Sequence, residues 1–245
     1  MWFGVVTIFP EMFNAINNYG ITKRAITNNL VKLNLYNPRN YTNDKHATVD
    51  DRPYGGGPGM VMKVEPILQA INHAKSDFIS LNANFSAPNV VCLSPQGKKI
   101  NQAYLREYTK QYNNIIFICG RYEGIDERIY PLAINEEWSI GDFVLSGGEL
   151  AAMAFIDAII RLIPGALGDP SSFLEDSFGD DSLLDYPNYT RPQSIYGLKV
   201  PEVLLSGNHA AIIEWRSQQR LMRTITKRKD LLSNILDQEK YNHVT

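Results

Sequence analysis

The stretch IGDFVLSGGEL, residues 140–150, places three large apolar residues shortly before two glycines and a glutamate. We expect residues 142–146 to form a buried strand, because a short apolar run is typical of a strand that is covered on both faces. A glycine pair at the end of a strand marks a sharp turn, or a place where another group comes close to the backbone. The stretch therefore raises the question of what lies against Gly147 and Gly148.

Similar apolar runs recur along the first two thirds of the chain and alternate with helical patterns. The strand-like runs are residues 5–9, 89–94, 114–119 and 142–146. The helical patterns cover residues 64–75, 101–112 and 149–163. Because strands of continuous apolar sequence are buried on both faces, this alternation predicts an α/β fold with a parallel sheet and helices on both faces.

The chain has 245 residues, which is enough for an α/β domain of about 160 residues and a small second domain. Pro164 and Gly165 end the last helical pattern, and the stretch 166–187 that follows contains six acidic residues and no Lys or Arg. We therefore expect an α/β domain over residues 1–165, an acidic interdomain linker over 166–185 and a small helical domain over 186–245.

The composition is that of a globular protein, with 44% hydrophobic and 20% charged residues. The first residues lack a basic segment, and Asp157 and Arg161 interrupt the apolar stretch 150–163, so we expect no membrane segment and a cytoplasmic protein. A net charge of −2 argues against a uniformly basic nucleic-acid binder but leaves room for a local basic face. Cys92 and Cys119 lie far apart in apolar runs, which favours free buried thiols over a disulfide or a metal role.

Three glycine-bearing segments, residues 94–99, 119–128 and 146–150, follow three of the expected strands. In an open parallel sheet the loops beyond the carboxyl ends of the strands converge, and ligands bind there. The sequence has neither a GxGxxG fingerprint after a strand nor the GxxxxGK[ST] fingerprint of P-loops. It therefore disfavours a generic dehydrogenase or a P-loop enzyme, and the residues alone leave a binding site and ordinary turns equally open.

A fourth segment, residues 50–60, holds four glycines and two prolines between positions 53 and 59. It fits a flexible lid, a turn packed closely against a flat substrate, or a solvent loop. The acidic segment EDSFGDD (175–181) lacks the ligand spacing of an EF-hand, because Phe178 stands where an oxygen ligand is needed. It fits a disordered tether, or a segment that orders on binding and supplies a carboxylate.

Near the C-terminus a row of basic residues follows helical spacing. Arg216, Arg220, Arg223 and Lys227 recur at intervals of four, three and four, which places them on one face of a helix. Such a row is either a solvated face or a surface that contacts phosphates. The segment 215–229 contains no acidic residue, which keeps phosphate contact open.

Several motifs together carry a family resemblance that covers almost the whole chain. They are DDRPYGGGPGM, LSPQG, CGRYEGIDER, IGDFVLSGGEL, EDSF and YTRP. By these motifs the chain resembles the bacterial tRNA (guanine-N1)-methyltransferases of the TrmD type, in the SPOUT superfamily. The resemblance implies an α/β domain whose C-terminal part forms a trefoil knot, an obligate homodimer with shared active sites, and S-adenosyl-L-methionine as cofactor. The implied reaction methylates N1 of the guanosine at tRNA position 37, next to the anticodon.

The resemblance also implies roles for particular residues. Arg161 and Asp176 match the family's catalytic pair, and the helical domain with its basic row is implied to bind tRNA. The two glycines are implied to let the chain pass close beneath the adenosyl group. No metal ligand is implied, and the resemblance leaves open whether Mg²⁺ takes part, with no residue assigned to it. The residues implied to hold the cofactor are Leu93, Ser94, Pro95, Gly120, Tyr122, Glu123, Ile140, Gly141, Asp142, Phe143, Val144, Leu145, Gly147 and Gly148.

The implied reaction needs a base, because guanine N1 carries a proton at neutral pH. That proton is nearly as weakly acidic as a phenol, so an ordinary carboxylate falls short by roughly 5 pKa units, or about 7 kcal/mol. Arg161 beside O6 would stabilise the negative charge that develops there as Asp176 takes the proton. The alternative is a non-catalytic RNA-binding or assembly factor on the same fold, and the presence of both residues argues against it.

Overall fold

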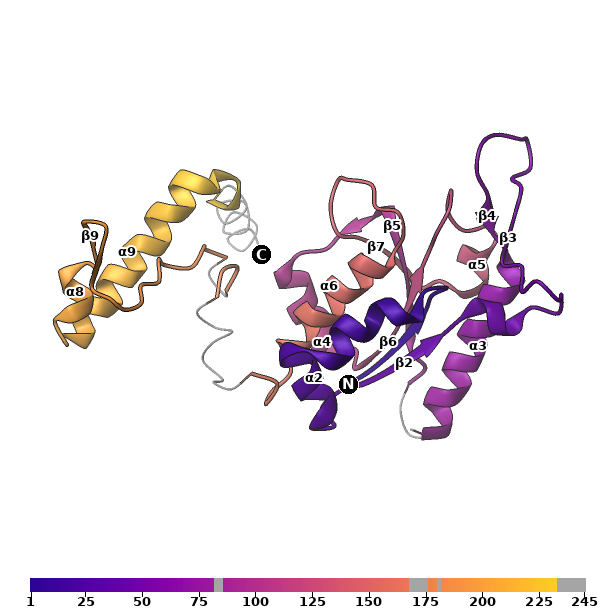
Figure 1. Cartoon of the computed structure of the whole chain (residues 1–245), viewed down its shortest axis with the longest axis horizontal. Coiled ribbons are helices and arrows are strands. Elements are labelled where there is room, and N and C mark those ends of the chain that lie inside the picture. The colour runs from indigo at the N-terminus through magenta and orange to yellow at the C-terminus, as the bar shows by residue number, and fades with distance from the viewer. Residues whose placement is uncertain (82–85, 168–175, 180–181, 233–245) are drawn as a thin grey trace, which may run out of the picture. The chain divides into compact units, whose positions relative to one another are not determined.

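The computed structural model describes residues 1–81, 86–167, 176–179 and 182–232 (Figure 1). The chain separates into two compact units, Met1–Gly168 and Asp169–Thr245, which we call unit 1 and unit 2. The division falls within the segment 166–185, and the three-part domain arrangement stays a prediction.

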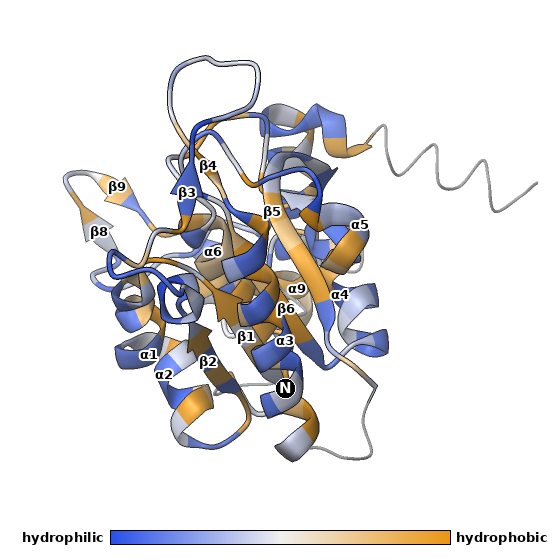
Figure 2. Cartoon of the chain, turned by 90° about the vertical axis from the view of Figure 1, so that its right-hand side faces the viewer, coloured by the Kyte–Doolittle hydropathy of each residue, from blue (hydrophilic) through white to orange (hydrophobic). Residues whose placement is uncertain are grey.

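Unit 1 is built on a five-stranded sheet in which every neighbouring pair is parallel. Every residue of β1 and β6 is buried, as expected for strands that are covered on both faces. The expected parallel α/β fold is confirmed, and Figure 2 shows hydrophobic residues along β5 and β6. The strand order is β2 (Lys32–Tyr36), β1 (Trp2–Val6), β6 (Asn114–Cys119), β5 (Asn89–Lys99) and β7 (Glu136–Ser139).

Successive residues of the central strands point to opposite faces, so the sheet carries two cores. The core that includes Phe3 and Phe117 also contains residues of four helices, and the core that includes Trp2 and Ile116 contains residues of two others. Helices therefore pack on both faces of the sheet, as predicted. The first group is α1 (Asn14–Asn18), α2 (Gly20–Thr27), α4 (Gln102–Gln111) and α6 (Glu149–Ile160), and the second is α3 (Val64–Leu81) and α5 (Ile129–Ala133).

Short elements flank this framework. The 3₁₀ helices η1 (Pro10–Phe13) and η2 (Pro38–Tyr41) follow β1 and β2. The glycine-rich segment lies between β3 (Asp50–Asp51) and β4 (Val61–Met62), which pair antiparallel. Met62 also forms a parallel bridge with Ile125, so this ribbon is joined to the segment that follows β6.

The strand expected at residues 142–146 is wrong. The strand in this part of the chain is β7, and residues 140–146 form an irregular loop. Phe143 and Val144 are 54% and 85% exposed, so their apolar side chains are not core residues. A short apolar run by itself cannot distinguish a buried strand from a loop that lines a cavity. The strand that forms, β7, begins with two glutamates, so its sequence has no continuous apolar run.

The segment 94–99 is also different from the loop that we expected. Strand β5 continues through it and pairs again with β7 at Lys98 and Lys99, after a register shift that begins at Leu93. Gly97 makes this possible, because a Cβ there would lie 2.5 Å from the carbonyl carbon of Glu137. The segment is therefore a bulged part of a strand, which lies close against the backbone of its neighbour.

The described residues of unit 2 include a two-stranded hairpin and two helices. Helix α9 begins after Asn208, whose side-chain oxygen accepts a hydrogen bond from the Ala211 amide at 3.2 Å, as in an N-cap. In the described ranges, no helix is long and apolar enough to cross a membrane. The elements are β8 (Ser194–Ile195), β9 (Leu198–Lys199), α8 (Glu202–Leu205) and α9 (His209–Lys227).

Candidate functional site

A cavity of about 390 Å³ lies in unit 1, at the carboxyl ends of β6 and β7 and the middle of β5. Most of its lining residues belong to three segments, 92–96 on β5, 120–127 after β6 and 138–148 at the end of β7, and Tyr130 of α5 and Ala151 of α6 complete the lining. This is the edge at which ligands bind in open parallel sheets. The three segments therefore form a candidate binding site.

All the residues implied to hold a cofactor line this cavity except Asp142. The Asp142 carboxylate lies 2.5 Å from Nζ of Lys99, and its side chain is 81% exposed. An exposed ion pair of this kind contributes little stability. The structure thus brings together three segments that are distant in the sequence, and their binding of a cofactor stays a prediction.

Gly147 and Gly148 lie against the segment that follows β6. Gly147 forms an antiparallel bridge with Arg121, and a Cβ on Gly147 would overlap the Arg121 side chain. The Gly148 amide donates a hydrogen bond to the Gly120 carbonyl at 3.0 Å, and a Cβ on Gly148 would lie 2.8 Å from the Cα of Cys119. The close approach is therefore between two walls of the cavity, and a side chain at either glycine would push them apart.

The glycine-rich segment contacts the same wall at one end only. The Glu123 amide donates to the Met60 carbonyl at 2.9 Å, and a Cβ on Gly59 would overlap the Glu123 side chain. At the other end Tyr54 is 98% exposed. Gly59 therefore packs against the protein's own wall, the residues around Tyr54 fit the solvent loop, and packing of the segment against a flat substrate stays a prediction.

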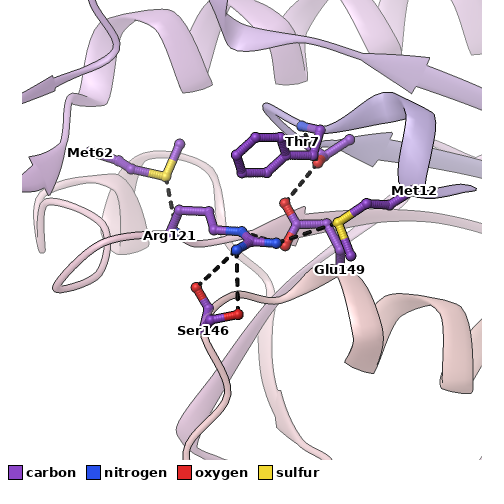
Figure 3. Close-up of polar contacts among 7 residues, drawn as sticks. Thr7, Met12, Met62, Arg121, Ser146 and Glu149 are labelled. Carbon is purple, nitrogen blue, oxygen red and sulfur yellow. Dashed lines mark hydrogen bonds and ion pairs between the residues drawn. The ribbon is translucent and has the colours of Figure 1, made fainter.

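A charged pair beside the glycines was not singled out from the sequence. Arg121 Nε lies 2.8 Å from an Oε atom of Glu149, whose side chain is completely buried at the first turn of α6 (Figure 3). Arg121 itself lines the cavity, whereas Glu149 does not. No local signal singles out this pair, because the motif CGRYEGIDER alone contains five charged residues.

Two thiols and a tyrosine at or next to the cavity have raised pKa values, and two of these groups, Cys92 and Tyr130, line the cavity. Burial raises the pKa of the Cys92 thiol to about 11 and raises the pKa of Cys119 well above its usual value. Burial also raises the pKa of Tyr130, whose hydroxyl lies 3.1 Å from a Glu137 carboxylate oxygen. Both cysteines are free and buried, as predicted. Among the described residues, no group of three or more His, Cys, Asp and Glu side chains is placed to hold a metal ion.

The two implied catalytic residues belong to different units. Arg161 lies at the C-cap of α6, where its amide donates to the Asp157 carbonyl at 3.1 Å. Asp176 lies in a bend of unit 2, where its carbonyl accepts a hydrogen bond from the Gly179 amide at 3.2 Å. Their pairing in one active site stays a prediction.

The basic row lies on α9, and two of its members contact the segment 184–186. The Arg216 guanidinium lies 4.5 Å from the centre of the Tyr186 ring. Arg220 Nε donates to the Leu184 carbonyl at 3.3 Å. These two arginines therefore help to position a neighbouring segment, and this role does not depend on whether they also contact phosphates. Lys227, at the end of the row, is exposed.

The fold and the cavity define the class first: this is a parallel α/β protein with a cavity at the carboxyl edge of its sheet, where ligands bind in such folds. Comparison with known proteins then shows the family. The sequence model of "tRNA (Guanine-1)-methyltransferase TrmD" matches residues 1–234, and the chain belongs to this family. Relatives named tRNA (guanine-N(1)-)-methyltransferase include proteins of Shewanella sp. (strain W3-18-1), Shewanella halifaxensis and Shewanella loihica. Each is 54% identical over 235 residues, which cover 96% of this chain and 92% of the relative.

Proposed function

We propose that this protein is an S-adenosyl-L-methionine-dependent methyltransferase that methylates N1 of the guanosine at position 37 of tRNA. The observation that carries the proposal is the cavity. In a chain that belongs to the family over nearly its full length, the residues implied to hold the cofactor converge on one site, with Asp142 as the exception.

The residues of the cavity suit the proposed cofactor. Gly120 and Gly141 carry no side chains, so the backbone of two walls is accessible to a flat ring. Glu123 and Glu127 also line the cavity, and their carboxylates favour a ligand that carries positive charge. When bound, S-adenosyl-L-methionine supplies an activated methyl group as a sulfonium.

The chemistry assigned to the chain's own residues is removal of a proton from guanine N1. A carboxylate alone falls short of this task by about 7 kcal/mol, because its ordinary pKa lies roughly 5 units below that of the N1 proton. In the proposal Arg161 lies against O6 and stabilises the negative charge that appears there. Asp176 accepts the proton, which makes the lone pair of N1 available for methylation.

The proposal extends to partners and architecture. Membership of the family supports a trefoil knot in the α/β domain, a homodimer in the cytoplasm and a helical second domain that binds tRNA through the basic row. We propose that each active site is shared, with the cavity from one subunit and Asp176 from the other. The arrangement is consistent with Asp176 belonging to a different unit from the one that forms the cavity. No residue is assigned to Mg²⁺.

One assay tests the reaction itself. Unmodified tRNA and S-adenosyl-L-methionine with a labelled methyl group are incubated with the protein, and the nucleosides are then separated. We expect labelled 1-methylguanosine, and no label in a matched tRNA in which adenosine replaces guanosine 37. Binding of tRNA without any transfer would instead favour the non-catalytic RNA-binding or assembly factor.

A further inference from the structure

Glu149 is a completely buried carboxylate that holds together groups from two other parts of unit 1. One of its oxygens accepts a hydrogen bond from Thr7 Oγ1 at 2.8 Å. The other lies 2.8 Å from Arg121 Nε, in an ion pair whose arginine side chain is only 18% exposed. Thr7 follows β1, Arg121 follows β6 and Glu149 opens α6, so one side chain connects three elements (Figure 3).

The remaining nitrogens of Arg121 are also engaged. Nη1 donates to the Ser146 carbonyl at 3.2 Å and lies 3.4 Å from the Ser146 hydroxyl. Nη2 lies 3.4 Å from the Met12 sulfur, and the guanidinium stacks 4.6 Å from the centre of the Phe9 ring. An arginine held on all sides in this way has a single orientation, because its planar donors each have a fixed direction.

A buried ion pair usually adds little to the stability of a fold. Removing two charges from water carries a large cost, and well-packed apolar residues often stabilise a core as well or better. The pair at this position is better explained by the geometry that it imposes. It lies where Gly147 and Gly148 approach Gly120 and Arg121, and those residues, unlike Glu149 and Thr7, line the cavity.

The wall that Arg121 belongs to has a strained backbone. Tyr122 has a φ of +61°, in the left-handed region that non-glycine residues rarely adopt. Such a conformation persists only where the surroundings hold it in place. Arg121 is the residue directly before it, and its amide donates to the Met62 sulfur at 3.3 Å, so the side chain and the backbone of Arg121 are both anchored.

We infer that Glu149, with Thr7, is a positioning residue that orients Arg121 and thereby sets the distance between the walls 120–123 and 146–148 of the cofactor cavity. The inference rests on the proposed function for the identity of the ligand. Glu149 and Thr7 act through Arg121 and do not line the cavity. Since a displacement of about 1 Å at a binding group costs on the order of 100-fold in rate, small changes in this pair are expected to be visible.

The test compares three substitutions with an exposed control. Glu149→Gln keeps the shape of the side chain and removes its charge. Thr7→Val removes the hydrogen bond to Glu149 and also the one that Thr7 Oγ1 accepts from the Phe9 amide at 3.0 Å, whereas Thr7→Ser keeps the hydroxyl. Glu107→Gln breaks an exposed pair with Lys110 on α4 and serves as the control. We expect the Kd for S-adenosyl-L-methionine, measured by calorimetry, to rise roughly tenfold or more in Glu149→Gln and several-fold in Thr7→Val. It should stay within about twofold of wild type in Thr7→Ser and Glu107→Gln.

A double variant separates positioning from stability. Replacing both partners of a buried pair removes the unpaired charge, so Arg121→Met with Glu149→Leu should recover most of the stability that Glu149→Gln loses. Positioning predicts that affinity stays low in the double variant. Recovery of affinity together with stability would overturn the inference, as would unchanged affinity in both Glu149→Gln and Thr7→Val.

Hydrogen exchange gives a readout that needs no ligand. The amides of Glu123 and Gly148 form the hydrogen bonds that join the cavity walls to their neighbours, so their exchange should accelerate in Thr7→Val and slow again in Thr7→Ser. If wild-type protein fails to bind S-adenosyl-L-methionine, the proposed function fails, and this exchange experiment still decides whether the pair holds the walls. Unchanged exchange at both amides in Thr7→Val would overturn the inference.

Discussion

Unit 1 and unit 2 differ in how they are held together. Unit 1 buries large apolar side chains on both faces of its sheet, including Trp138, Phe117 and Ile116. In the described part of unit 2, no apolar side chain is buried, and Thr224 is the buried polar residue. Its exposed apolar residues are Phe178, Tyr189, Ile195, Tyr196, Leu198, Leu205, Ile213, Leu221, Met222 and Ile225.

In the described part of unit 2, polar contacts and ring contacts connect the segments. Thr224 Oγ1 accepts a hydrogen bond from the Leu184 amide at 3.0 Å and donates to the Arg220 carbonyl at 2.8 Å. The Tyr189 and Trp215 rings lie 6.4 Å apart. Such contacts orient a segment, but each contributes little net free energy. Unit 1 therefore has a core that supports a preformed cavity, while the described part of unit 2 leaves ten large apolar side chains exposed.

The sharpest way to test this division of roles is Asp176→Ala. If unit 1 alone holds the cofactor, the loss of a base in unit 2 should leave the Kd for S-adenosyl-L-methionine unchanged. Methyl transfer should fall by about 10²- to 10⁴-fold, the usual range for a general base. Single-turnover kinetics with saturating cofactor and tRNA measure the chemical step.

Asp230→Ala is the matched control for Asp176→Ala. It removes another carboxylate of unit 2, one that is 61% exposed and pairs with Arg228. Its effect on the chemical step should be within about twofold, because an exposed ion pair contributes little. Loss of cofactor affinity in Asp176→Ala with a normal chemical step would contradict the assignment of the base.

Phe117→Ala addresses the core of unit 1. Phe117 is completely buried and packs against Phe3 and Phe155, with ring centres 6.3 Å away in each case. Its truncation should lower the free energy of unfolding by about 3–5 kcal/mol. The matched change in α9 is Ile213→Ala, at a side chain that is 66% exposed, and there we expect a change within about 0.5 kcal/mol. Urea unfolding followed by circular dichroism measures both, and equal losses would erase the contrast between the units.

Parts of unit 1 could be predicted because their signals are local. The continuous apolar sequence of β6 identified a buried strand, and the periodicity of residues 64–75 and 101–112 identified α3 and α4. The strand β7 was not predicted, because the hydrogen-bond partners of Glu136 include two residues that are distant in the sequence, Asn89 and Tyr104. The Glu136 carboxylate accepts hydrogen bonds from Asn89, Tyr104 and Trp138, at 2.7, 2.5 and 2.9 Å. No local pattern reveals such partners.

The candidate site shows the same limit. The resemblance named 13 of the 24 residues that line the cavity, but it did not name the charged pair beside the glycines. Thr7 and Glu149 are 142 positions apart in the sequence, and only the fold brings them to 2.8 Å. The residues of unit 2 could be named by spacing, as in the basic row, but the spacing did not show that Arg216 and Arg220 contact the segment 184–186.

Those contacts decide how the basic row should be tested. Replacing Arg220 would also remove a hydrogen bond to Leu184, so Arg223→Ala with Lys227→Ala is the cleaner change. We expect tRNA binding to weaken roughly tenfold and its logarithmic dependence on salt to flatten by up to about one unit for each lost phosphate contact. The control is Lys110→Ala, which removes the positive charge of an exposed lysine on α4 in unit 1. An unchanged salt dependence would assign the row to a solvated face.

The last experiment has the smallest expected effect, a fourfold difference from wild type. It tests whether the cavity of one subunit uses Asp176 of the other subunit. Two inactive variants are unfolded and reassembled together: Gly141→Val, which alters the cavity wall, and Asp176→Ala. If sites are shared, a mixed dimer has one site with both defects and one site with neither. If each subunit works alone, both of its sites are defective. Random assembly makes about half of the dimers mixed, so shared sites should restore about a quarter of wild-type activity.

Methyl transfer is measured beside each variant reassembled alone, and mass spectrometry of the intact dimers counts the mixed species. Mixed dimers without activity would show that each site is built within one chain, and that unit 2 supplies Asp176 to the cavity of its own subunit.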